Sequence, residues 1–405
     1  MYDIEPSSSP IRDRRDLDRV TAALLNGQGL AGTDQVVNDY EHALSQFFDT
    51  KHATAVSSGT AAIHAVLHAL NVSPGDEVIV PAIAAVMTAL PIIEMGAKPI
   101  FVDCKKDSFQ IDVDRLKATI TRRTKAIMSV PMWGYPATSS ELKSFCKAQG
   151  IPLVIDAAQA IGTIADGIFE GTNGDAGCFS THEIKLISTG EGGFVLTDNS
   201  ELNNAISVFV RLGNRPGSEK KTFGQDVGLN YKFNVLGAGL GISQIGKLPE
   251  TLEHRRKNAT AWFENLAPYG ECLTPFFLET ESNRPSFYSV IFLLDPELAD
   301  ITCAKQVAAK LAQVGFKTDI YKYDFKLMPE YPVFQKHGAR QSNISVTDQF
   351  PNAASVLKRM LVLPTHSAIT EEVVIDACNR IICTLPKKYF ERTPEPLIHP
   401  RLLTT

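Results

Sequence analysis

The 405-residue sequence has no excess of basic residues, no long apolar run and a polar beginning. Its formal net charge of -5 gives no electrostatic reason to bind nucleic acid, which calls for a strongly basic face. No stretch approaches the ~20 apolar residues that a membrane span needs. The first residues carry Asp and Glu and resemble neither a secretory signal nor a transit peptide. We therefore expect no nucleic-acid partner and no membrane partner.

Cysteines are few: seven are scattered along the chain, and none forms a Cys-x-x-Cys pair. An odd, unpaired set argues against a disulfide framework and against a structural zinc site, and it favours a reducing compartment, with the cytoplasm as the expected location. His64 and His68 are spaced as metal ligands on a helix can be, but no third ligand is evident. We therefore predict no metal site.

Short apolar runs alternate with longer amphipathic segments between about residues 52 and 200. Strands are predicted at 77–82, 98–103, 125–133, 152–157, 177–181 and 192–198, and helices at 60–71, 86–95, 113–120, 138–149 and 201–211. Several of the strands are apolar at consecutive positions, as buried parallel strands are. The sequence therefore predicts an α/β fold in which helices cover both faces of a mainly parallel sheet.

The pattern changes near residue 250, where "KLPETLEHRRKNATAWFENL" predicts one long charged helix. Mixed strand and helix patterns follow and indicate a smaller α+β domain. The sequence predicts a large domain at 16–250 and a small C-terminal domain at 251–386. A flexible N-terminus at 1–15 and a C-terminal tail at 387–405 are expected to flank them.

Polar residues follow several of the predicted strands, at the sheet edge where ligands bind in open α/β folds. In "SSGTAA", Ser58, Gly59 and Thr60 begin a helix, whose free backbone N–H groups can bind an anion such as phosphate. Ser58 or Thr60 could instead simply cap that helix. Asp156 ends a buried strand, where a carboxylate needs a donor or a cation, although it too could be a helix cap.

Lys185 lies between Ser180 and a tight glycine turn, within "CFSTHEIKLISTGEGG". A lysine in a desolvated pocket loses its proton more readily and can form a Schiff base, whereas most lysines are solvated surface residues. Pyridoxal phosphate requires an anion pocket, a lysine amine and a carboxylate against its ring nitrogen. The sequence offers a candidate for each, so together they favour a pyridoxal phosphate site.

Five segments carry a family resemblance: "GDEVIVPA", "MGAKPIFVD", "VIDAAQAIG", "FSTHEIKLISTGEGG" and "VGLNYKFNVLGAGLGISQIGKL". With "LVLPTHSAITEEVV" they resemble the DegT/StrS family of pyridoxal-phosphate enzymes, mostly sugar aminotransferases of the aspartate-aminotransferase fold (fold type I), over about residues 20–385. The resemblance implies an aminotransferase that converts a keto group of a sugar, nucleotide sugar or related polyhydroxylated acceptor to an amine. It also implies glutamate or glutamine as the donor and a ping-pong mechanism.

The resemblance assigns roles around the cofactor. Lys185 would form the aldimine with the cofactor, and Asp156 would hold the proton on the ring nitrogen. Gln159 would lie near the ring hydroxyl, and His182 would lie beside the cofactor.

The phosphate of the cofactor would be held by residues from three segments. Ser58, Gly59, Thr60 and Ser180 would bind it within one chain. The family also uses an asparagine from the neighbouring subunit, here Asn230, so the resemblance implies at least a homodimer with a shared active site.

The chain departs from the family pattern where an aromatic residue usually stacks on the cofactor. Ala85 stands at that position, within "PAIAAVMTA". Trp133 and Met87 are candidates to cover the ring instead, or they are plain core residues.

Substrate contacts are suggested by Trp133 and by two further segments. "RLGNRPGSEKK" offers Arg211 and Arg215 to an anionic substrate, and "TDIYKYDFKLMPEYP" offers Tyr321 and Tyr323 to an unusual acceptor. Both segments could equally be solvated loops.

Two other functions remain open at this stage. One is a pyridoxal-phosphate dehydratase or oxidative deaminase on the same scaffold. Some dehydratases of the family carry histidine at the position of Lys185, so the lysine favours transamination. The other is a non-catalytic regulatory relative, which the intact set of Lys185, Asp156 and Ser180 disfavours.

Overall fold

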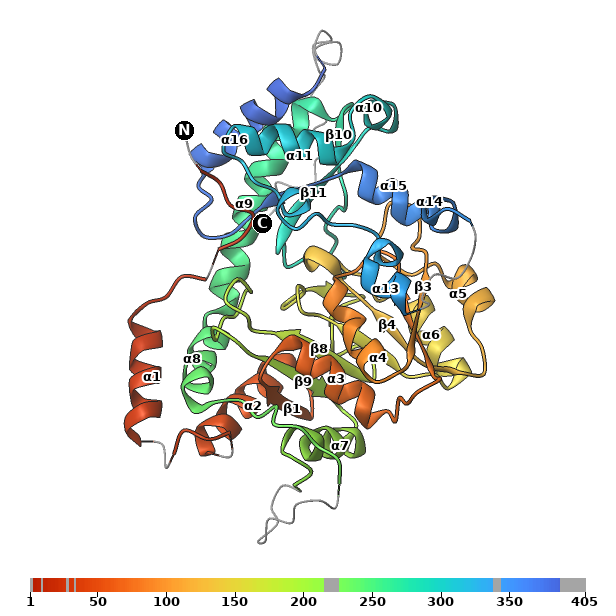
Figure 1. Cartoon of the computed structure of the whole chain (residues 1–405). Coiled ribbons are helices and arrows are strands. Elements are labelled where there is room, and N and C mark those ends of the chain that lie inside the picture. Colours follow the sequence, from red (N-terminus) through yellow and green to blue (C-terminus); the bar gives the residue numbers. More distant parts are fainter. Residues whose placement is uncertain are drawn as a thin grey trace.

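The computed structural model describes residues 3–8, 10–26, 29–32, 34–214, 226–337 and 344–386. The C-terminal tail expected at 387–405 lies outside the described residues, and so does Arg215. Figure 1 shows a large lower part built around a sheet and a smaller upper part, joined by one long helix.

A seven-stranded sheet with the order β1-β9-β8-β5-β4-β2-β3 organises the large part. The strands are β1 (His52–Val56), β2 (Glu77–Pro81), β3 (Lys98–Val102), β4 (Thr124–Ser129), β5 (Leu153–Asp156), β8 (Ala176–Ser180) and β9 (Gly193–Thr197). From β8 to β3 all neighbours are parallel, whereas β9 is antiparallel to both β8 and β1. The predicted α/β fold with a mainly parallel sheet is confirmed.

Helices cover both faces of this sheet because its strands are apolar on both sides. Ile79 and Ile127 face a cluster that includes Leu116 and Leu142, whereas Val80 and Met128 join the main core on the other face. The helices of this part are α1 (Arg14–Asn26), α2 (Gln35–Phe48), α3 (Gly59–Ala69), α4 (Leu90–Glu94), α5 (Val113–Thr119), α6 (Ser140–Gln149), α7 (Ser200–Val210) and α8 (Val235–Gly246). A small hairpin, β6 (Ile164–Ala165) and β7 (Ile168–Phe169), lies outside the sheet.

Two local predictions differ from the structure, and the direction of a third element was not predicted. The strand predicted at 125–133 ends at Ser129, because Pro131 cannot donate to a sheet and a 3₁₀ turn follows at 132–134. The helix predicted at 86–95 is split into a 3₁₀ turn and α4, which begins around Pro91. Strand β9 is antiparallel because the loop that joins it to β8 contains no crossover helix.

The long helix α9 (Leu248–Leu266) leads into a three-stranded antiparallel sheet, with the order β10-β11-β12. Its strands are β10 (Leu273–Pro275), β11 (Ser289–Leu294) and β12 (Met360–Pro364). Around it lie α10 (Pro296–Ile301), α11 (Ala304–Gln313), α12 (Asp319–Lys322), α13 (Pro332–Lys336), α14 (Val346–Gln349), α15 (Pro351–Arg359) and α16 (Glu371–Thr384). One continuous apolar core contains residues of both parts of the chain.

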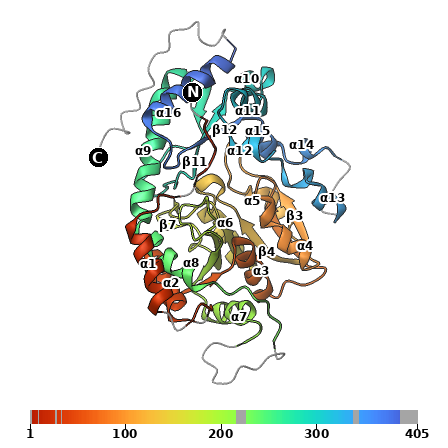
Figure 2. The ribbon, with the colours of Figure 1, turned by 60° about the vertical axis from the view of Figure 1, so that its left-hand side comes forward.

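The N-terminal residues pack more closely than the expected flexible segment at 1–15. Ile4 is buried and exchanges backbone hydrogen bonds with Gly315 and Lys317, each of 2.8 Å. Glu5 accepts hydrogen bonds from Lys317 and Lys322. The chain then crosses to α1, which packs on α8 (Figure 2). The sequence alone did not indicate these contacts, because single apolar side chains such as Ile4 give no periodic signal.

Across the part of the chain that the structure describes, no helix is both long and apolar enough to cross a membrane. The same residues contain no cluster of three His, Cys, Asp or Glu side chains suited to a metal ion. His64 instead shares a hydrogen bond of 3.0 Å with the Tyr231 hydroxyl, and His68 stacks on Phe209 at 4.0 Å.

Candidate active site

Asp156 is the last residue of β5 and is buried. Its Oδ2 accepts a hydrogen bond of 2.5 Å from Thr88 Oγ1, and its Oδ1 accepts one of 3.2 Å from the Ala158 backbone N–H. No cationic side chain of the described ranges lies within ion-pair distance. Burial raises the pKa of Asp156, and these hydrogen bonds and Lys185 act in the opposite direction. The carboxylate therefore suits a cationic N–H ligand.

Lys185 lies in the loop between β8 and β9, where its backbone N–H donates to His182 O at 2.9 Å. Its Nζ is 5.2 Å from the centre of the Tyr288 ring, and within the described chain no hydrogen bond or ion pair to it is found. Burial lowers the pKa of Lys185 to about 8, against the opposing effect of Asp156 and Asp319. At neutral pH the neutral, nucleophilic amine is thus far more abundant than in an exposed lysine.

The start of α3 and the end of β8 form a backbone cradle. Ser58 caps α3, because its Oγ accepts from Ala61 N–H at 3.0 Å, so the capping alternative holds for this residue. A Cβ on Gly59 would lie only 2.9 Å from Ser180 Cβ, and one on Gly193 would lie 2.8 Å from the Gly59 nitrogen. These contacts bring the helix N-terminus directly beside Ser180, as an anion site requires.

Trp133 links the predicted cofactor site to the small part of the chain. Its backbone N–H donates to Gln159 Oε1 at 2.9 Å, and its indole Nε1 donates to Asp319 Oδ2 at 2.9 Å. The residue is 2% exposed and has a φ of 51°, which is rare outside glycine. Burial and these two hydrogen bonds therefore hold Trp133 in one position between Gln159 and Asp319. Met87, by contrast, is 55% exposed in the single chain.

Several predicted site residues lie on the surface of the single chain. Thr60 and Asn230 are exposed, and Asn230 Oδ1 accepts a hydrogen bond of 2.5 Å from Lys232. His182 is half-buried, and its Nε2 lies 3.7 Å from Glu191 Oε1. Ala85 is half-buried and directly precedes the 3₁₀ turn at 86–88.

Of the other predicted substrate residues that the structure describes, one has an internal partner and two are exposed. Arg211 forms an ion pair of 3.4 Å with Glu41, so its charge already has an internal partner. Tyr321 and Tyr323 are 48% and 52% exposed.

Three residues of the site were not predicted: Thr88, Tyr288 and Asp319. Thr88 lies in the "PAIAAVMTA" segment, three residues after Ala85. It is the only residue of that segment with a polar side chain, so it could have been identified as a candidate site residue from the sequence. Asp319 lies in the segment that drew attention through its tyrosines. Tyr288 directly precedes β11 and belongs to no recognisable motif, so the sequence did not single it out.

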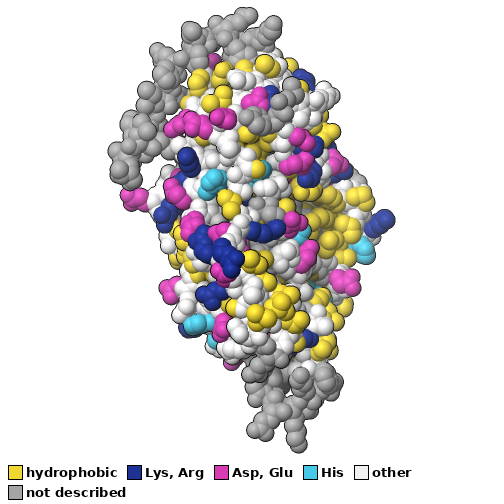
Figure 3. Space-filling model, turned by 90° about the vertical axis from the view of Figure 1, so that its left-hand side faces the viewer, with side chains coloured by type: hydrophobic (Ala, Val, Ile, Leu, Met, Phe, Trp, Pro, Cys, Tyr) yellow, Lys and Arg dark blue, Asp and Glu magenta, His cyan; other side chains and the backbone are white. Residues whose placement is uncertain are grey.

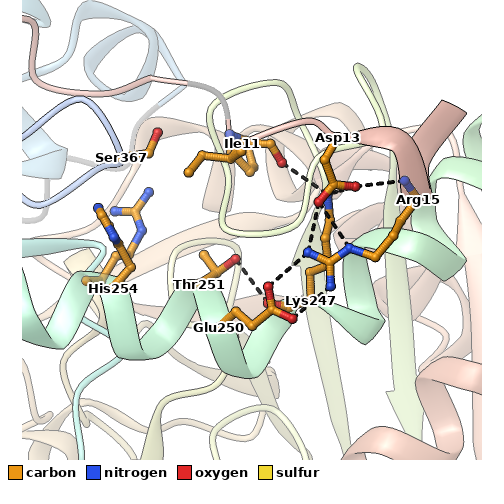
Figure 4. Close-up of a pocket in the computed structure, with 10 residues that line it drawn as sticks. Ile11, Asp13, Arg15, Lys247, Glu250, Thr251, His254 and Ser367 are labelled. Carbon is orange, nitrogen blue, oxygen red and sulfur yellow. Dashed lines mark hydrogen bonds and ion pairs between the residues drawn. The ribbon is translucent and has the colours of Figure 1, made fainter.

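A separate cavity of about 240 Å³ lies between the N-terminal segment and the start of α9 (Figure 4). Most charges in it pair with one another, as Arg15 does with Asp13 and Glu250, each at 2.8 Å. Neither Lys185 nor Asp156 lines this cavity. Arg255 lines the cavity, and its Nη1 donates a hydrogen bond of 2.7 Å to the Tyr288 backbone O. This bond fixes the backbone of Tyr288, whose ring faces Lys185.

The fit of pyridoxal phosphate to this site can be judged from its residues. A cradle of backbone at a helix N-terminus suits a phosphate. A buried carboxylate with no ion pair among the described residues suits a protonated ring nitrogen, and a lysine amine of lowered pKa suits an aldehyde. The fold and the site therefore define a pyridoxal-phosphate enzyme of fold type I.

Comparison with known proteins places the chain within that class. The pattern of the DegT/DnrJ/EryC1/StrS aminotransferase family matches residues 10–382. GDP-perosamine synthase of Vibrio cholerae is 30% identical over 87% of this chain and 90% of its own. Spore coat polysaccharide biosynthesis protein SpsC of Bacillus subtilis is 29% identical over 93% of this chain and 96% of its own.

Among solved structures, Helicobacter pylori PseC, an aminotransferase involved in the biosynthesis of pseudoaminic acid, superposes with a TM-score of 0.82. It is 25% identical and the match covers 94% of this chain and 98% of PseC. The chain belongs to the DegT/DnrJ/EryC1/StrS aminotransferase family, and it is a pyridoxal-phosphate-dependent aminotransferase. The resemblance drawn from the sequence motifs is confirmed.

The cradle predicts a selective effect of Gly59→Ala. The new Cβ would press on Ser180 and displace the first turn of α3, so we expect the Kd for pyridoxal phosphate to rise by about tenfold or more. Binding of pyridoxal, which lacks the phosphate, should change much less. Gly246→Ala is the control, because nothing lies within 4 Å of a Cβ there. Equal effects on both ligands in a fluorescence titration would place the phosphate elsewhere.

The lowered pKa of Lys185 predicts how cofactor attachment depends on pH. Only the neutral amine attacks the aldehyde, so the attachment rate of the apoprotein should rise by about tenfold per unit below pH 8 and level off above it. An ordinary lysine would continue to gain up to about pH 10.4. Stopped-flow absorbance after mixing with the cofactor measures this rate. A rise that continues through pH 9 would show that the amine is not desolvated.

Proposed function

We propose that the protein transfers an amino group to the keto group of a sugar, nucleotide sugar or related polyhydroxylated acceptor. The donor is glutamate or glutamine, and the cycle is ping-pong. The names of the relatives support the acceptor class, because they concern perosamine, a coat polysaccharide and pseudoaminic acid. The observation that carries the proposal is the Lys185 amine, which has a lowered pKa, lies near Asp156 and has no hydrogen-bond or ion-pair partner among the described residues.

The roles of the residues follow from their chemistry. When bound, pyridoxal phosphate supplies an electron sink for the carbon that carries the amino group. Asp156 holds a proton-bearing ring nitrogen through its buried carboxylate, while Thr88 keeps that carboxylate in place. Lys185 would hold the cofactor through its amine, and its Nζ, when free, would remove and return the proton of the reacting carbon.

We further propose that the active unit is a homodimer in the cytoplasm, with Asn230 serving the phosphate site of the partner. In the single chain Asn230 is exposed, and so is the neighbouring Leu229. Figure 3 shows apolar side chains on the face that carries α1, where Leu17, Leu24 and Leu25 are exposed. Apolar side chains gathered on one exposed face are typical of an interaction surface. Sedimentation of the purified protein tests the dimer, and Asn230→Ala should weaken cofactor binding only if a partner completes the site.

One experiment separates transamination from the other chemistries of this scaffold. The protein is loaded with pyridoxal phosphate, and its visible absorbance band is followed during addition of L-glutamate or L-glutamine. Bleaching of the band with release of the matching 2-oxo acid supports the proposal. A band unchanged by either donor while oxygen is consumed with another amine identifies an oxidative deaminase. A protein that forms no band is a non-catalytic relative.

A further inference from the structure

The cavity between the N-terminal segment and the start of α9 has one end at which the charges balance one another. Arg15 pairs there with Asp13 and Glu250, each at 2.8 Å. Lys247 pairs with Asp16 at 2.5 Å, and its Nζ also lies 3.6 Å from Asp13 Oδ1. Among the described residues, three carboxylates therefore accompany two cations at this end. It offers no unpaired positive charge to a ligand.

Arg255 lines the same cavity and is 5% exposed. Its Nη1 donates hydrogen bonds to Tyr288 O at 2.7 Å and to Thr365 Oγ1 at 3.2 Å, and both of these acceptors are neutral. Within the described chain, no Asp or Glu forms an ion pair with it. Burial lowers the pKa of Arg255 to about 10, which still leaves the guanidinium charged at neutral pH. A buried charge of this kind is costly unless an anion completes it.

His254 and Ser367 lie on the side of the cavity away from the paired charges (Figure 4). Nε2 of His254 is buried and has no hydrogen-bond partner in the described structure. Burial lowers the pKa of His254, and the charges of Arg255 and Lys257 act in the same direction, so the ring is neutral at neutral pH. A neutral imidazole can carry its proton on Nε2 and donate it. Adjacent residues of α9 thus bring a cation and an unpartnered imidazole nitrogen to one cavity.

These features define the charge and the size of a ligand. A guanidinium presents a planar pair of N–H groups that matches a carboxylate or a phosphate. One unpaired cation balances one negative charge, and the excess of carboxylates at the other end disfavours a second. A cavity of about 240 Å³ holds several water-sized groups, so a short carbon chain fits beside the anionic group. Pro10 and Ile11 also line the cavity and offer apolar contacts to such a chain.

We propose that this cavity is a binding site for a small organic monocarboxylate, whose carboxylate group is held by Arg255 and His254. Neither Lys185 nor Asp156 lines the cavity, so the site is separate from that of the reaction and goes beyond the proposed function. It is connected to the reaction site through Arg255, which also holds the backbone of Tyr288, whose ring faces Lys185.

Binding to the holoenzyme tests the proposal, because bound pyridoxal phosphate keeps the probes out of the cofactor site. The probes are sodium butyrate, butyramide, which has the same shape without the charge, and inorganic phosphate, all at one ionic strength. Isothermal titration calorimetry gives the three Kd values. We expect butyrate to bind at least about tenfold more tightly than butyramide, because only the carboxylate balances the charge of Arg255. A phosphate Kd below the butyrate Kd would overturn the assignment to a carboxylate.

Ser367 provides a matched pair of variants. Ser367→Asp places a carboxylate of the chain itself in the cavity, and Ser367→Asn has nearly the same shape without the charge. The aspartate variant should raise the butyrate Kd by about tenfold or more, whereas the asparagine variant should change it by less than about threefold. Without butyrate, the aspartate holoenzyme should also have the higher Tm of the two. Arg255→Gln should likewise lose butyrate binding, and the Ser367 pair decides the matter if that variant does not fold.

The contrary results are equally clear. Equal butyrate Kd values for the two Ser367 variants would show that butyrate binds elsewhere, and this overturns the proposal. A wild-type holoenzyme that binds neither butyrate nor butyramide, or binds both equally, overturns it as well. A lower Tm for the aspartate variant than for the asparagine variant would mean that Arg255 does not lack a counter-charge.

Discussion

Replacing Lys185 by alanine is expected to abolish covalent attachment of the cofactor and to lower transamination by at least about 10³-fold. The expected decrease in rate is large because one amine has two functions: it binds the cofactor and it carries the proton of the reacting carbon. The fold should persist, since Lys185 has no hydrogen bond or ion pair from its side chain in the described structure. Removing an amine whose charged form is penalised by burial should slightly stabilise the apoprotein.

Lys185→Arg is the matched variant for this prediction. A guanidinium keeps a positive charge near Asp156 and Asp319 but cannot form an imine at neutral pH. We expect it to bind pyridoxal phosphate without a covalent bond and to be as inactive as the alanine variant. Borohydride reduction followed by peptide mass analysis measures attachment directly. Added cofactor mass on any peptide other than the one with Lys185, or substantial activity of the arginine variant, would contradict the assignment.

The residues that the sequence predicted best are those that follow strands along the chain. Asp156 and Lys185 each end or follow an apolar run, and "SSGTAA" begins a helix, so their positions at one sheet edge follow from the α/β pattern. The direction of β9 relative to its neighbours was not predictable in the same way, because an apolar run of five residues fits a parallel and an antiparallel strand equally well. It follows from the short loop that holds Lys185.

What the sequence could not predict comes from segments distant in the chain. The hydrogen bond between Thr88 and Asp156 joins residues that are 68 positions apart in the sequence. The hydrogen bond between Trp133 and Asp319 joins residues that are 186 positions apart. No local pattern encodes such pairs, since each depends on how the two parts of the chain pack. Arg211 is a second example: its basic, glycine-rich segment predicts a substrate contact, and the sequence gives no sign that Glu41 of a distant helix is its ion-pair partner.

Asp156→Asn is expected to lower the rate of transamination by about 10²-fold or more, because a neutral amide cannot stabilise the proton on the ring nitrogen. The substitution is close to isosteric. Its amide oxygen can accept from Ala158 N–H, and its NH₂ can donate to the Thr88 hydroxyl, which both donates and accepts. Any loss of activity therefore reports the charge rather than a disturbed site. Single-turnover bleaching with glutamate measures it.

The same substitution should stabilise the apoprotein by about 1–3 kcal/mol at neutral pH, because it removes a buried charge for which the described residues offer no ion pair. The folded pKa of Asp156 is raised above its ordinary 3.8, so wild-type stability is lost as pH rises from 3.8 through the folded pKa, and the variant escapes that loss. The difference in unfolding free energy should therefore grow with pH and then level off. Urea unfolding of both apoproteins at several pH values measures it.

The cofactor should reverse this order of stability. Pyridoxal phosphate supplies the missing cation to Asp156 and raises the stability of the wild type according to its affinity, whereas the asparagine variant gains less. We expect a smaller cofactor-induced rise in Tm for Asp156→Asn, together with the more stable apoprotein. A variant that is less stable without the cofactor, yet gains as much from it as the wild type, would mean that this carboxylate serves the fold and not the ring.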